Sequence, residues 1–306
     1  MSSDQQLEFI TVDVFTSKPY EGNPLAIVRI PHGVTITQDQ KQIIAREFNL
    51  SESTFLHEKD ADVQKNEWTV DIFMTTKELP FAGHPTIGTA CFVLSRAAQE
   101  RGIQDGIIEA SFELKAGHVG LRYDVAKKTA RAAIPHDVSV QPRLADALHQ
   151  KKSRVQDSFP IVSIVQGMTF VLVELDSLEA LEQVDLAGQT LEISGLDEGW
   201  DQTFVGTYFF VRLGKSASGV IEIRTRMIEG PLEDPATGSA ASDLAAYLSL
   251  KEGKPKETSR YEIVQGVEMG RRSEIFIDVE MDTGGDISKV FLEGGAVPVM
   301  EGILRV

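Results

Sequence analysis

The chain has 306 residues, of which 42% are hydrophobic and 25% are charged, as is typical of a globular protein with one large or two ordinary domains. Its net charge of −16 argues against nucleic acid or an anionic membrane surface as a partner. The first residues lack the pattern of a signal peptide, no apolar run has the length of a membrane helix, and a single cysteine excludes an internal disulfide. We therefore expect a cytoplasmic protein.

Short apolar and β-branched runs, separated by Gly, Asn and Pro, predict many strands and few helices. The predicted strands are 9–15, 25–30, 68–74, 107–112, 119–123, 129–134, 161–165, 170–174, 208–213, 220–226, 274–280 and 290–299. The predicted helices are 38–49, 85–98, 143–149, 178–182 and 235–250. This mixture indicates an α+β protein.

One short pattern occurs twice in the chain. PTIGTA at 85–90 and PATGSA at 235–240 share the frame P-x-x-G-[ST]-A. Each follows a strand-like run and a lead-in with an acidic residue and a proline, and each continues into an apolar helical pattern. The frame is short, but its matching context on both sides predicts two related halves.

The two copies of the frame also place polar residues at predicted helix starts. Proline is favourable at the first helical position, which puts Pro85 and Pro235 there and His84 and Asp234 at or beside the N-caps. Aspartate is a common N-cap, so Asp234 has a good purely structural explanation. Histidine is a poorer cap and titrates near neutral pH, so His84 is either a turn residue or a group that exchanges protons.

Small residues fill the first turn of both predicted helices, including Gly88, Gly238 and Ser239. A helix start without bulky side chains exposes N–H groups that bind a carboxylate or phosphate. The alternative is that these residues only permit close helix packing. The chain has no metal-ligand spacing, no GxGxxG and no Walker sequence, so we expect no metal ion and no cofactor.

A further candidate lies in the helical stretch TQDQKQIIAREFN. Glu47 is spaced three and four residues from Ile44 and Ile43, which predicts that it lies on the apolar stripe of this helix. A carboxylate there would have a raised pKa suited to proton transfer near neutral pH. The alternative is a glutamate at the edge of the stripe that reaches water. Together, Glu47, His84 and Asp234 suggest an acid–base site without a cofactor, but they do not identify a substrate.

Five stretches resemble the PhzF-like family, which is named after the phenazine-biosynthesis isomerase. They are VDVFTSKPYEGNPLAIV, AREFNLSESTF, ELPFAGHPTIGTA, EDPATGSA and QGVEMGRRSEIFIDV, and the resemblance extends from about Phe9 to Val306. It implies the diaminopimelate-epimerase fold, in which two similar domains each wrap a curved, mostly antiparallel sheet around a central helix, with the active site in the cleft between them. The implied halves are residues 1–127, completed by about 288–306, and residues 128–287.

The resemblance also implies roles for individual residues. The glutamate of the ARE-x-NLSE segment that moves the proton is assigned to Glu47, and His84 and Asp234 are implied as relay and hydrogen-bonding groups. Gly83, Gly238 and Ser239 are implied as donors to the substrate carboxylate, and Asn23 of the GNP turn as a residue lining the site or an ordinary turn residue. The two cysteines of related racemases are missing, and Cys91 falls inside a helix, where we expect a core residue.

The sequence departs from the family pattern at Asp71 and Arg272, which we interpret as surface changes, and in a shortened segment before EDPATGSA that bears on which substrate fits. The leading hypothesis is a cofactor-independent isomerase or epimerase that shifts a proton on a small carboxylate-bearing metabolite, similar to a dihydro-hydroxyanthranilate. The alternative is a catalytically silent metabolite-binding or interaction protein on the same fold. The resemblance further implies a homodimer.

Overall fold

The computed structural model describes residues 6–59, 66–134, 139–141, 159–165, 167–186, 188–191, 193 and 204–306. The chain divides into two compact units: unit 1 comprises residues 1–133 with 293–306, and unit 2 comprises residues 134–292. The halves implied by the family resemblance, 1–127 with about 288–306 and 128–287, differ from these units by five or six residues at each boundary. The predicted helix 143–149 lies outside the described residues.

Unit 1 is a closed ring of paired strands. Its elements are β1 (Gln6–Val14), β2 (Asn23–Ile30), α1 (Gln38–Phe48), β3 (Glu52–His57), β4 (Glu67–Met74), β5 (Glu78–Leu79), α2 (Gly83–Glu100), β6 (Ile107–Leu114), β7 (Gly117–Asp124), β8 (Thr129–Ala133) and the part of β17 (Ile287–Arg305) from residue 293 onward. The strands pair in the order β17–β1–β2–β3–β4–β6–β7–β8, and β8 pairs with β17 to close the ring.

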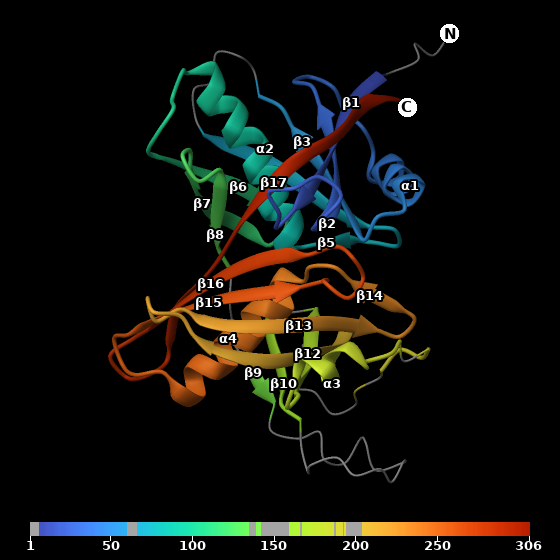
Figure 1. Ribbon diagram of the computed structural model, residues 1–306. Coiled ribbons are helices and arrows are strands. Elements are labelled where there is room, and N and C mark those ends of the chain that lie inside the picture. Colours follow the sequence, from blue (N-terminus) through green and yellow to red (C-terminus); the bar gives the residue numbers. More distant parts are fainter. Residues whose placement is uncertain are drawn as a thin grey trace. The chain divides into compact units, whose positions relative to one another are not determined.

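Helix α2 runs through this ring (Figure 1). It contacts β1, β2, β3, β7 and β8, and every residue from Phe81 to Cys91 is buried. A helix that is buried on all sides has no polar face, which explains why CFVLSRAA continues the first turn with mostly apolar residues. Cys91 is a core residue, as expected: its thiol is buried, and burial raises its pKa to about 12.

Unit 2 contains a sheet and its own central helix. Its elements are β9 (Ser139–Gln141), β10 (Ile161–Val165), β11 (Met168–Glu174), α3 (Leu178–Glu182), β12 (Phe204–Lys215), β13 (Ile221–Glu229), β14 (Leu232–Asp234), α4 (Gly238–Glu252), β15 (Thr258–Gln265) and β16 (Ser273–Met281). The strands pair in the order β9–β10–β11–β12–β13–β15–β16, with β14 also paired to β13. Helix α4 packs against β10, β11, β15 and β16.

The two units repeat one topology. The order β1-β2-α1-β3-β4-β5-α2-β6-β7 in unit 1 corresponds to β10-β11-α3-β12-β13-β14-α4-β15-β16 in unit 2. The pairing directions also match: β2–β3 and β4–β6 are parallel, as are β11–β12 and β13–β15, while the corresponding hairpins are antiparallel. The prediction of two related halves is therefore confirmed, and the shared sequence frame marks the start of each central helix.

The two central helices do not begin where the sequence predicted. Helix α2 begins at Gly83, so His84 and Pro85 lie inside its first turn, whereas α4 begins after Thr237, so Asp234 and Pro235 precede the helix. The prediction that each proline is the first helical residue is wrong. Proline is tolerated within the first turn of α2 because the N–H groups there have no partner in the helix.

The start of α4 is delayed by a tertiary contact. The N–H of Thr237 donates to Oε1 of Gln265 at 3.2 Å, and Thr237 has an extended backbone with φ −115° and ψ 90°. Gln265 lies 28 residues further along the chain. A contact over that distance leaves no local pattern, so the sequence frame alone could not reveal it.

Strands β3 and β15 were not predicted. Strand β3 begins four residues after the end of α1, and β15 begins six residues after the end of α4 with the polar residues Thr258, Ser259 and Arg260. Both strands lie inside their sheets, β3 between β2 and β4 and β15 between β13 and β16. Pairing on both sides therefore overrides weak local strand propensity.

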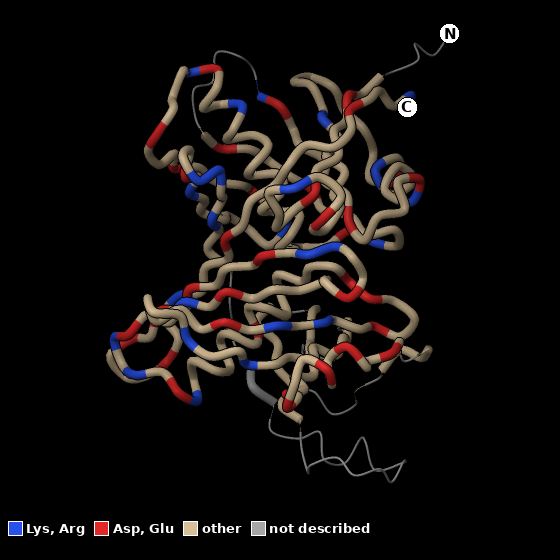
Figure 2. The backbone as a smooth tube through the Cα atoms, in the orientation of Figure 1, with Lys and Arg blue, Asp and Glu red and all other residues tan. Residues whose placement is uncertain are grey.

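The acidic excess of the chain is not concentrated in one segment. Acidic and basic residues are interspersed along both units (Figure 2). In the part of the chain that the structure describes, no helix is long and apolar enough to cross a membrane.

Close packing of α2 against the ring yields a stability prediction at Gly88. A Cβ atom there would lie 2.6 Å from Val14 Cγ2 and 2.7 Å from Leu25 Cδ2, and both side chains are fully buried. We expect Gly88→Ala to lower the free energy of unfolding by about 1–3 kcal/mol because the core must shift to accept the methyl group. Urea unfolding measures this change. Gly120→Ala is the matched control, since a Cβ atom there meets no atom within 4 Å, and equal destabilisation by both substitutions would contradict the packing argument.

Candidate active site

His84 is the buried titratable group at the start of α2, with 5% of its surface exposed. Its Nδ1 atom lies 3.5 Å from Oε2 of Glu52, the first residue of β3. The ring also hydrogen-bonds to the backbone of Pro24. Proline has no N–H, so its backbone accepts and the ring nitrogen facing it carries a proton. The Nε2 atom is buried and has no hydrogen-bond partner in the described structure.

Burial keeps His84 neutral. Desolvation lowers its pKa from 6.5 to about 3, and the hydrogen bond to Pro24 raises the pKa by less than burial lowers it. At neutral pH the imidazole therefore holds a single proton and offers one lone pair. Such a group can orient a neighbouring carboxylate or relay a proton, but it carries no positive charge at neutral pH.

Glu52 is the carboxylate that the fold places beside His84, and the sequence analysis did not select it. Helix α1 ends at Asn49, whose left-handed backbone (φ 52°) terminates the helix, and the chain re-enters the sheet three residues later as β3. The Glu52 side chain is 12% exposed. The stretch NLSE contains Glu52, so the signal was present in the sequence, but the apolar-stripe argument favoured the other glutamate of that segment.

The prediction that Glu47 lies on the apolar stripe of α1 is wrong, because its side chain is exposed. The stripe contains Lys41, Ile44, Ala45 and Phe48, whereas Ile43, which was used to locate the stripe, is 62% exposed. Successive helical residues are about 100° apart, so Glu47 points well away from Phe48. The structure does not bring Glu47 to His84.

A buried lysine determines which face of α1 packs inward. Lys41 is 5% exposed, and its Nζ lies 2.5 Å from Oδ2 of Asp71 on β4. His57 Nε2 lies 2.8 Å from the same oxygen. Burial raises the pKa of Asp71, but the hydrogen bonds from His57 and Lys41 outweigh burial and lower it. Asp71 is thus not an ordinary surface change, and the period of apolar residues alone could not show that a lysine faces inward.

Asn23 and Gly83 complete the unit 1 group. Asn23 is 1% exposed and opens β2, next to the Pro24 backbone that binds His84. Gly83 is the first residue of α2. His84 on α2 therefore contacts Pro24 of β2 and Glu52 of β3.

The predicted site residues of unit 2 lie at the start of α4. Asp234 ends β14, and its Oδ2 accepts a hydrogen bond from the Thr237 hydroxyl at 2.5 Å. Gly238 and Ser239 are buried at the first two positions of the helix. Thr237 and Gln265 were not predicted as site residues, although Gln265 begins the QGVEMG stretch that carries the family resemblance.

The starts of the two central helices differ electrically from those of the outer helices. In α1 and α3 the first turn is capped by the side chains of Thr37 and Ser177. Neither α2 nor α4 has a side-chain cap or an acidic residue in its first turn. Uncapped N–H groups retain partial positive charge, so both starts are suited to an anion.

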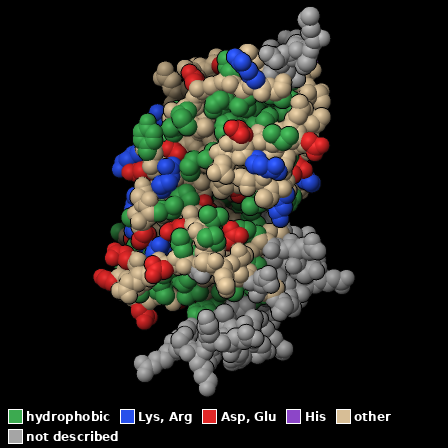
Figure 3. Space-filling view, turned by 90° about the vertical axis from the view of Figure 1, so that its right-hand side faces the viewer, with side chains coloured by type: hydrophobic (Ala, Val, Ile, Leu, Met, Phe, Trp, Pro, Cys, Tyr) green, Lys and Arg blue, Asp and Glu red, His purple; other side chains and the backbone are tan. Residues whose placement is uncertain are grey.

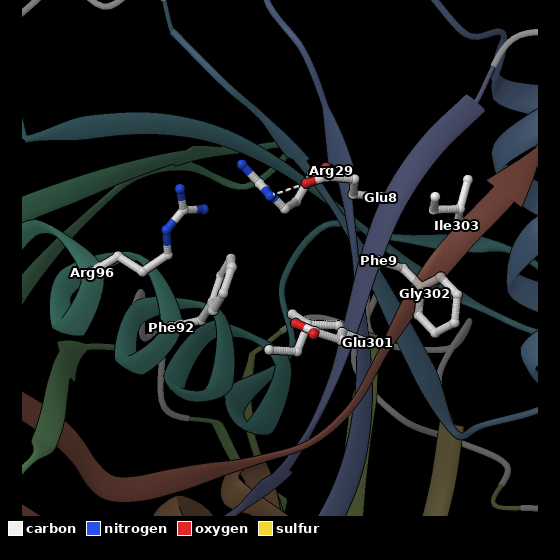
Figure 4. Close-up of a pocket in the computed structure, with 9 residues that line it drawn as sticks. Glu8, Phe9, Arg29, Phe92, Arg96, Glu301, Gly302 and Ile303 are labelled. Carbon is white, nitrogen blue, oxygen red and sulfur yellow. Dashed lines mark hydrogen bonds and ion pairs between the residues drawn. The ribbon is translucent and has the colours of Figure 1, made fainter.

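A pocket of about 530 Å³ lies elsewhere in unit 1, among β1, β2, α2 and β17 (Figure 4). Arg29 in its wall pairs with Glu8 and Glu58, and Arg96 lies near Glu58 and over the ring of Phe92. Each arginine already has an acidic partner, so no unmatched charge identifies a ligand. None of the predicted site residues lines this pocket.

Two halves of one α+β topology, each with polar groups at the start of its central helix, define the diaminopimelate-epimerase-like class of folds. The chain belongs to the PhzC-PhzF family of phenazine biosynthesis-like proteins, which it matches over residues 12–302. It is therefore a PhzF-family isomerase or epimerase.

Several curated relatives of similar length are named as isomerases. The chain is 30% identical over 311 residues to an uncharacterized isomerase of Mesorhizobium japonicum, covering 98% of this chain and 99% of the relative. It is 30% identical over 303 residues to trans-2,3-dihydro-3-hydroxyanthranilate isomerase of Pseudomonas chlororaphis, covering 97% and 98%.

Solved structures share the fold at lower identity. A Bacillus anthracis protein of the PhzF family has a TM-score of 0.73 at 21% identity, covering 99% of this chain and 100% of that chain. A hydroxyproline epimerase of Agrobacterium vitis has a TM-score of 0.62 at 13% identity, covering 100% and 94%. These likenesses confirm the predicted fold class.

The neutral state of His84 predicts how stability changes with pH. Its pKa in the folded state is about 3, so between that value and 6.5 the unfolded chain binds more protons and stability falls as the pH falls. From pH 7.5 to 5.5 this residue should cost about 1.4 kcal/mol of unfolding free energy, and His84→Gln should lack that loss. Urea unfolding of both proteins at the two pH values measures the difference.

Other titrating groups are common to both proteins, so they cancel in this comparison. One of them is Asp243, whose pKa is raised by burial and which therefore acts with the opposite sign. His118 is exposed, and His118→Gln is the control. An unchanged pH dependence in His84→Gln would contradict a buried neutral imidazole.

Proposed function

We propose that the chain is a cofactor-independent isomerase that shifts a proton on a small carboxylate-bearing metabolite, with Glu52 as the group that takes and returns the proton. The observation that carries this proposal is the approach of Glu52 Oε2 to within 3.5 Å of Nδ1 of the buried, neutral His84. Both groups lie at the ends of regular elements, which hold them in place.

The chemistry follows from what each group can do. A carboxylate that is 12% exposed and fixed at the start of a strand can act as a general base toward a weakly acidic C–H bond. Glu52 would take the proton, and the electron pair of the broken C–H bond would form a new double bond. The electron pair of the adjacent, original double bond would then bind the returned proton at its far carbon. No oxidant or reductant is consumed in such a shift.

Neutral His84 supports this step as a relay and orienting group. One ring nitrogen is held by the Pro24 backbone, while Nε2 is buried without a partner among the described residues. A buried polar atom without a partner is costly unless a ligand or water satisfies it. We propose that Nε2 hydrogen-bonds to the bound substrate.

The remaining predicted residues serve binding. Gly83, Gly238 and Ser239 lie in first turns that lack caps and acidic side chains, which suits them to the substrate carboxylate. Asp234 is proposed as a second polar group that contacts the substrate, and Asn23 as a residue lining the site next to Pro24.

The relatives suggest the first compound to test. Curated relatives at about 30% identity are named trans-2,3-dihydro-3-hydroxyanthranilate isomerases, and this compound carries both a carboxylate and a C–H bond next to a double bond. At that identity the substrate of this chain can differ. The two-residue turn at Gly230 and Pro231, between β13 and β14, corresponds to the shortened segment and is one place where it could differ.

We also propose a homodimer, on the family resemblance. Large hydrophobic side chains are exposed on β17, where Met300 is 61% and Ile303 is 62% exposed, and the face in Figure 3 shows hydrophobic side chains among charged ones. Light scattering of the full chain should give twice the 33.6 kDa mass of one chain, and a mass of one chain at micromolar concentration would contradict a stable dimer.

The paired variants Glu52→Gln and Glu47→Gln test the proton-transfer group. With trans-2,3-dihydro-3-hydroxyanthranilate in D₂O, we expect the wild type to incorporate deuterium at carbon, as followed by NMR. Glu52→Gln should lower that rate by about 10²–10⁴-fold because it removes the base while keeping the shape. Glu47→Gln should leave the rate unchanged because that side chain is exposed.

If Glu47→Gln lowered the exchange rate and Glu52→Gln did not, the assignment of proton transfer to Glu47 from the sequence would be restored. Circular dichroism of both variants controls for folding. If the wild type exchanges no proton in this compound or in a panel of related unsaturated carboxylates, but binds one of them tightly, the catalytically silent alternative is supported.

A further inference from the structure

Gln265 is a fully buried amide at the end of β15 whose hydrogen-bonding capacity is completely used. Its Oε1 accepts from the Tyr208 hydroxyl at 3.0 Å and from the Thr237 N–H at 3.2 Å. Its Nε2 donates to the Asp234 carbonyl at 2.8 Å and to the Thr237 hydroxyl at 3.0 Å. Two acceptor sites and two N–H donors are all that a glutamine side chain offers.

The orientation of this amide is fixed by its backbone partners. The Thr237 N–H can only donate, so it must face Oε1, and the Asp234 carbonyl can only accept, so it must face Nε2. A flipped amide would place a donor against a donor and an acceptor against an acceptor. The directions of the remaining hydrogen bonds follow from this orientation.

These bonds form a chain of donors that points in one direction. Thr225 Oγ1 donates to the Tyr208 hydroxyl at 3.0 Å, and Tyr208 donates to Gln265 Oε1. Gln265 Nε2 donates to Thr237 Oγ1, which therefore turns its own hydrogen to Asp234 Oδ2, at 2.5 Å. Tyr208 stays protonated, since burial raises its pKa, so the direction of the chain is stable over the working range of pH.

The chain of donors ends on the carboxylate of Asp234, to which the proposed function assigns a role in binding substrate. Strands β12, β13 and β15 of unit 2 each contribute one buried side chain, namely Tyr208, Thr225 and Gln265. These side chains are hydrogen-bonded in series, and Gln265 binds the segment between β14 and α4. Asp234 itself is only partly buried. The partners that fix its position are therefore less exposed than the group they hold.

We infer that Thr237 and Gln265, supported by Tyr208, are positioning residues that hold Asp234 as an oriented hydrogen-bond acceptor in the substrate-binding site. This inference rests on the proposed function for the role of Asp234. It predicts that this carboxylate accepts a hydrogen from an N–H or O–H group of the substrate and does not act as the acid that protonates carbon.

The duplicated topology shows that such a network is not a general requirement of the fold. Strand β6, the counterpart of β15, ends at the apolar Leu114, and α2 is already helical from Gly83. Unit 1 therefore forms its helix start without an amide at this position. The network occurs in the half where an aspartate, rather than a buried imidazole, stands at the matching place in the frame.

The protein contains a matched control for the substitution of Tyr208, in the form of a second buried tyrosine whose hydroxyl is hydrogen-bonded. Tyr261 on β15 and Ser249 on α4 form a buried hydroxyl pair at 2.9 Å, within the same unit and against the same helix. This pair lies outside the chain of donors that runs from Thr225 to Asp234. Tyr208→Phe and Tyr261→Phe thus each remove a buried hydroxyl that is hydrogen-bonded, but only the hydroxyl of Tyr208 belongs to the chain of donors.

The first experiment compares Thr237→Val with Thr237→Ser. The valine substitution keeps the shape but removes the hydroxyl, whereas serine keeps the hydroxyl. With trans-2,3-dihydro-3-hydroxyanthranilate as the probe, we expect Thr237→Val to lower kcat/KM by about 10- to 100-fold, by analogy with the loss found when groups that orient metal-ligating side chains are removed. Thr237→Ser should retain most of the activity. Tyr208→Phe should reduce kcat/KM, and Tyr261→Phe should not, although both lower the unfolding free energy.

The second experiment is independent of turnover. Crystal structures of Thr237→Val and Thr237→Ser should show the Asp234 carboxylate displaced in the first variant and in its original place in the second. If the carboxylate stays in place in Thr237→Val, or if Tyr261→Phe lowers kcat/KM as much as Tyr208→Phe does, the inference is overturned. A different result is also possible: Asp234→Asn could be fully active while the Asp234 carboxylate is displaced in Thr237→Val. In that case the proposed function fails at Asp234, and the positioning network stands.

Discussion

The enclosure of an entire helix by strands is the constraint on which the rest of unit 1 depends. Helix α2 is buried on every side over its first half, so most of its residues there are small or apolar, and at Gly88 even a methyl group has no room. The same enclosure brings the helix start beside the first residues of β2 and β3. Any polar group at that start is desolvated, which is why His84 is neutral and held by the Pro24 backbone. A buried imidazole is thus a consequence of the architecture, and Glu52 lies within reach of it because β3 begins there.

The two units show how one topology can give two different helix starts. In unit 1 the helix extends back through Gly83, and the polar residue of the frame lies within its first turn. In unit 2 the Gln265 side chain binds the segment before Gly238 and keeps Asp234 outside the helix. One start therefore presents a neutral ring and the other an oriented carboxylate. Hydrogen bonds from distant strands, rather than the shared frame, produce this difference.

The position of Glu47 shows the limit of reading a helix face from apolar spacing. The stretch QKQIIAREF offers two overlapping apolar faces, and the pair Ile43–Ile44 does not distinguish them. The inward face is selected by Lys41, whose amine forms an ion pair with Asp71 on β4 while its stem lies against the core. Because that partner is 30 residues away, the pattern of the helix alone favoured the wrong glutamate.

The sequence by itself determined the fold class, the duplication and the core position of Cys91, and it predicted candidate site residues around 83–88 and 234–239. These features depend on local composition, on a repeated frame and on motifs with characteristic spacing, all of which are properties of neighbouring residues. Tertiary structure alone decided where each central helix begins, which face of α1 is buried, and which carboxylate reaches His84. Each of those depends on contacts such as Glu52 with His84 and Gln265 with Thr237, which join residues 32 and 28 positions apart. Interactions at such separations leave no periodic signal, so only the folded chain reveals them.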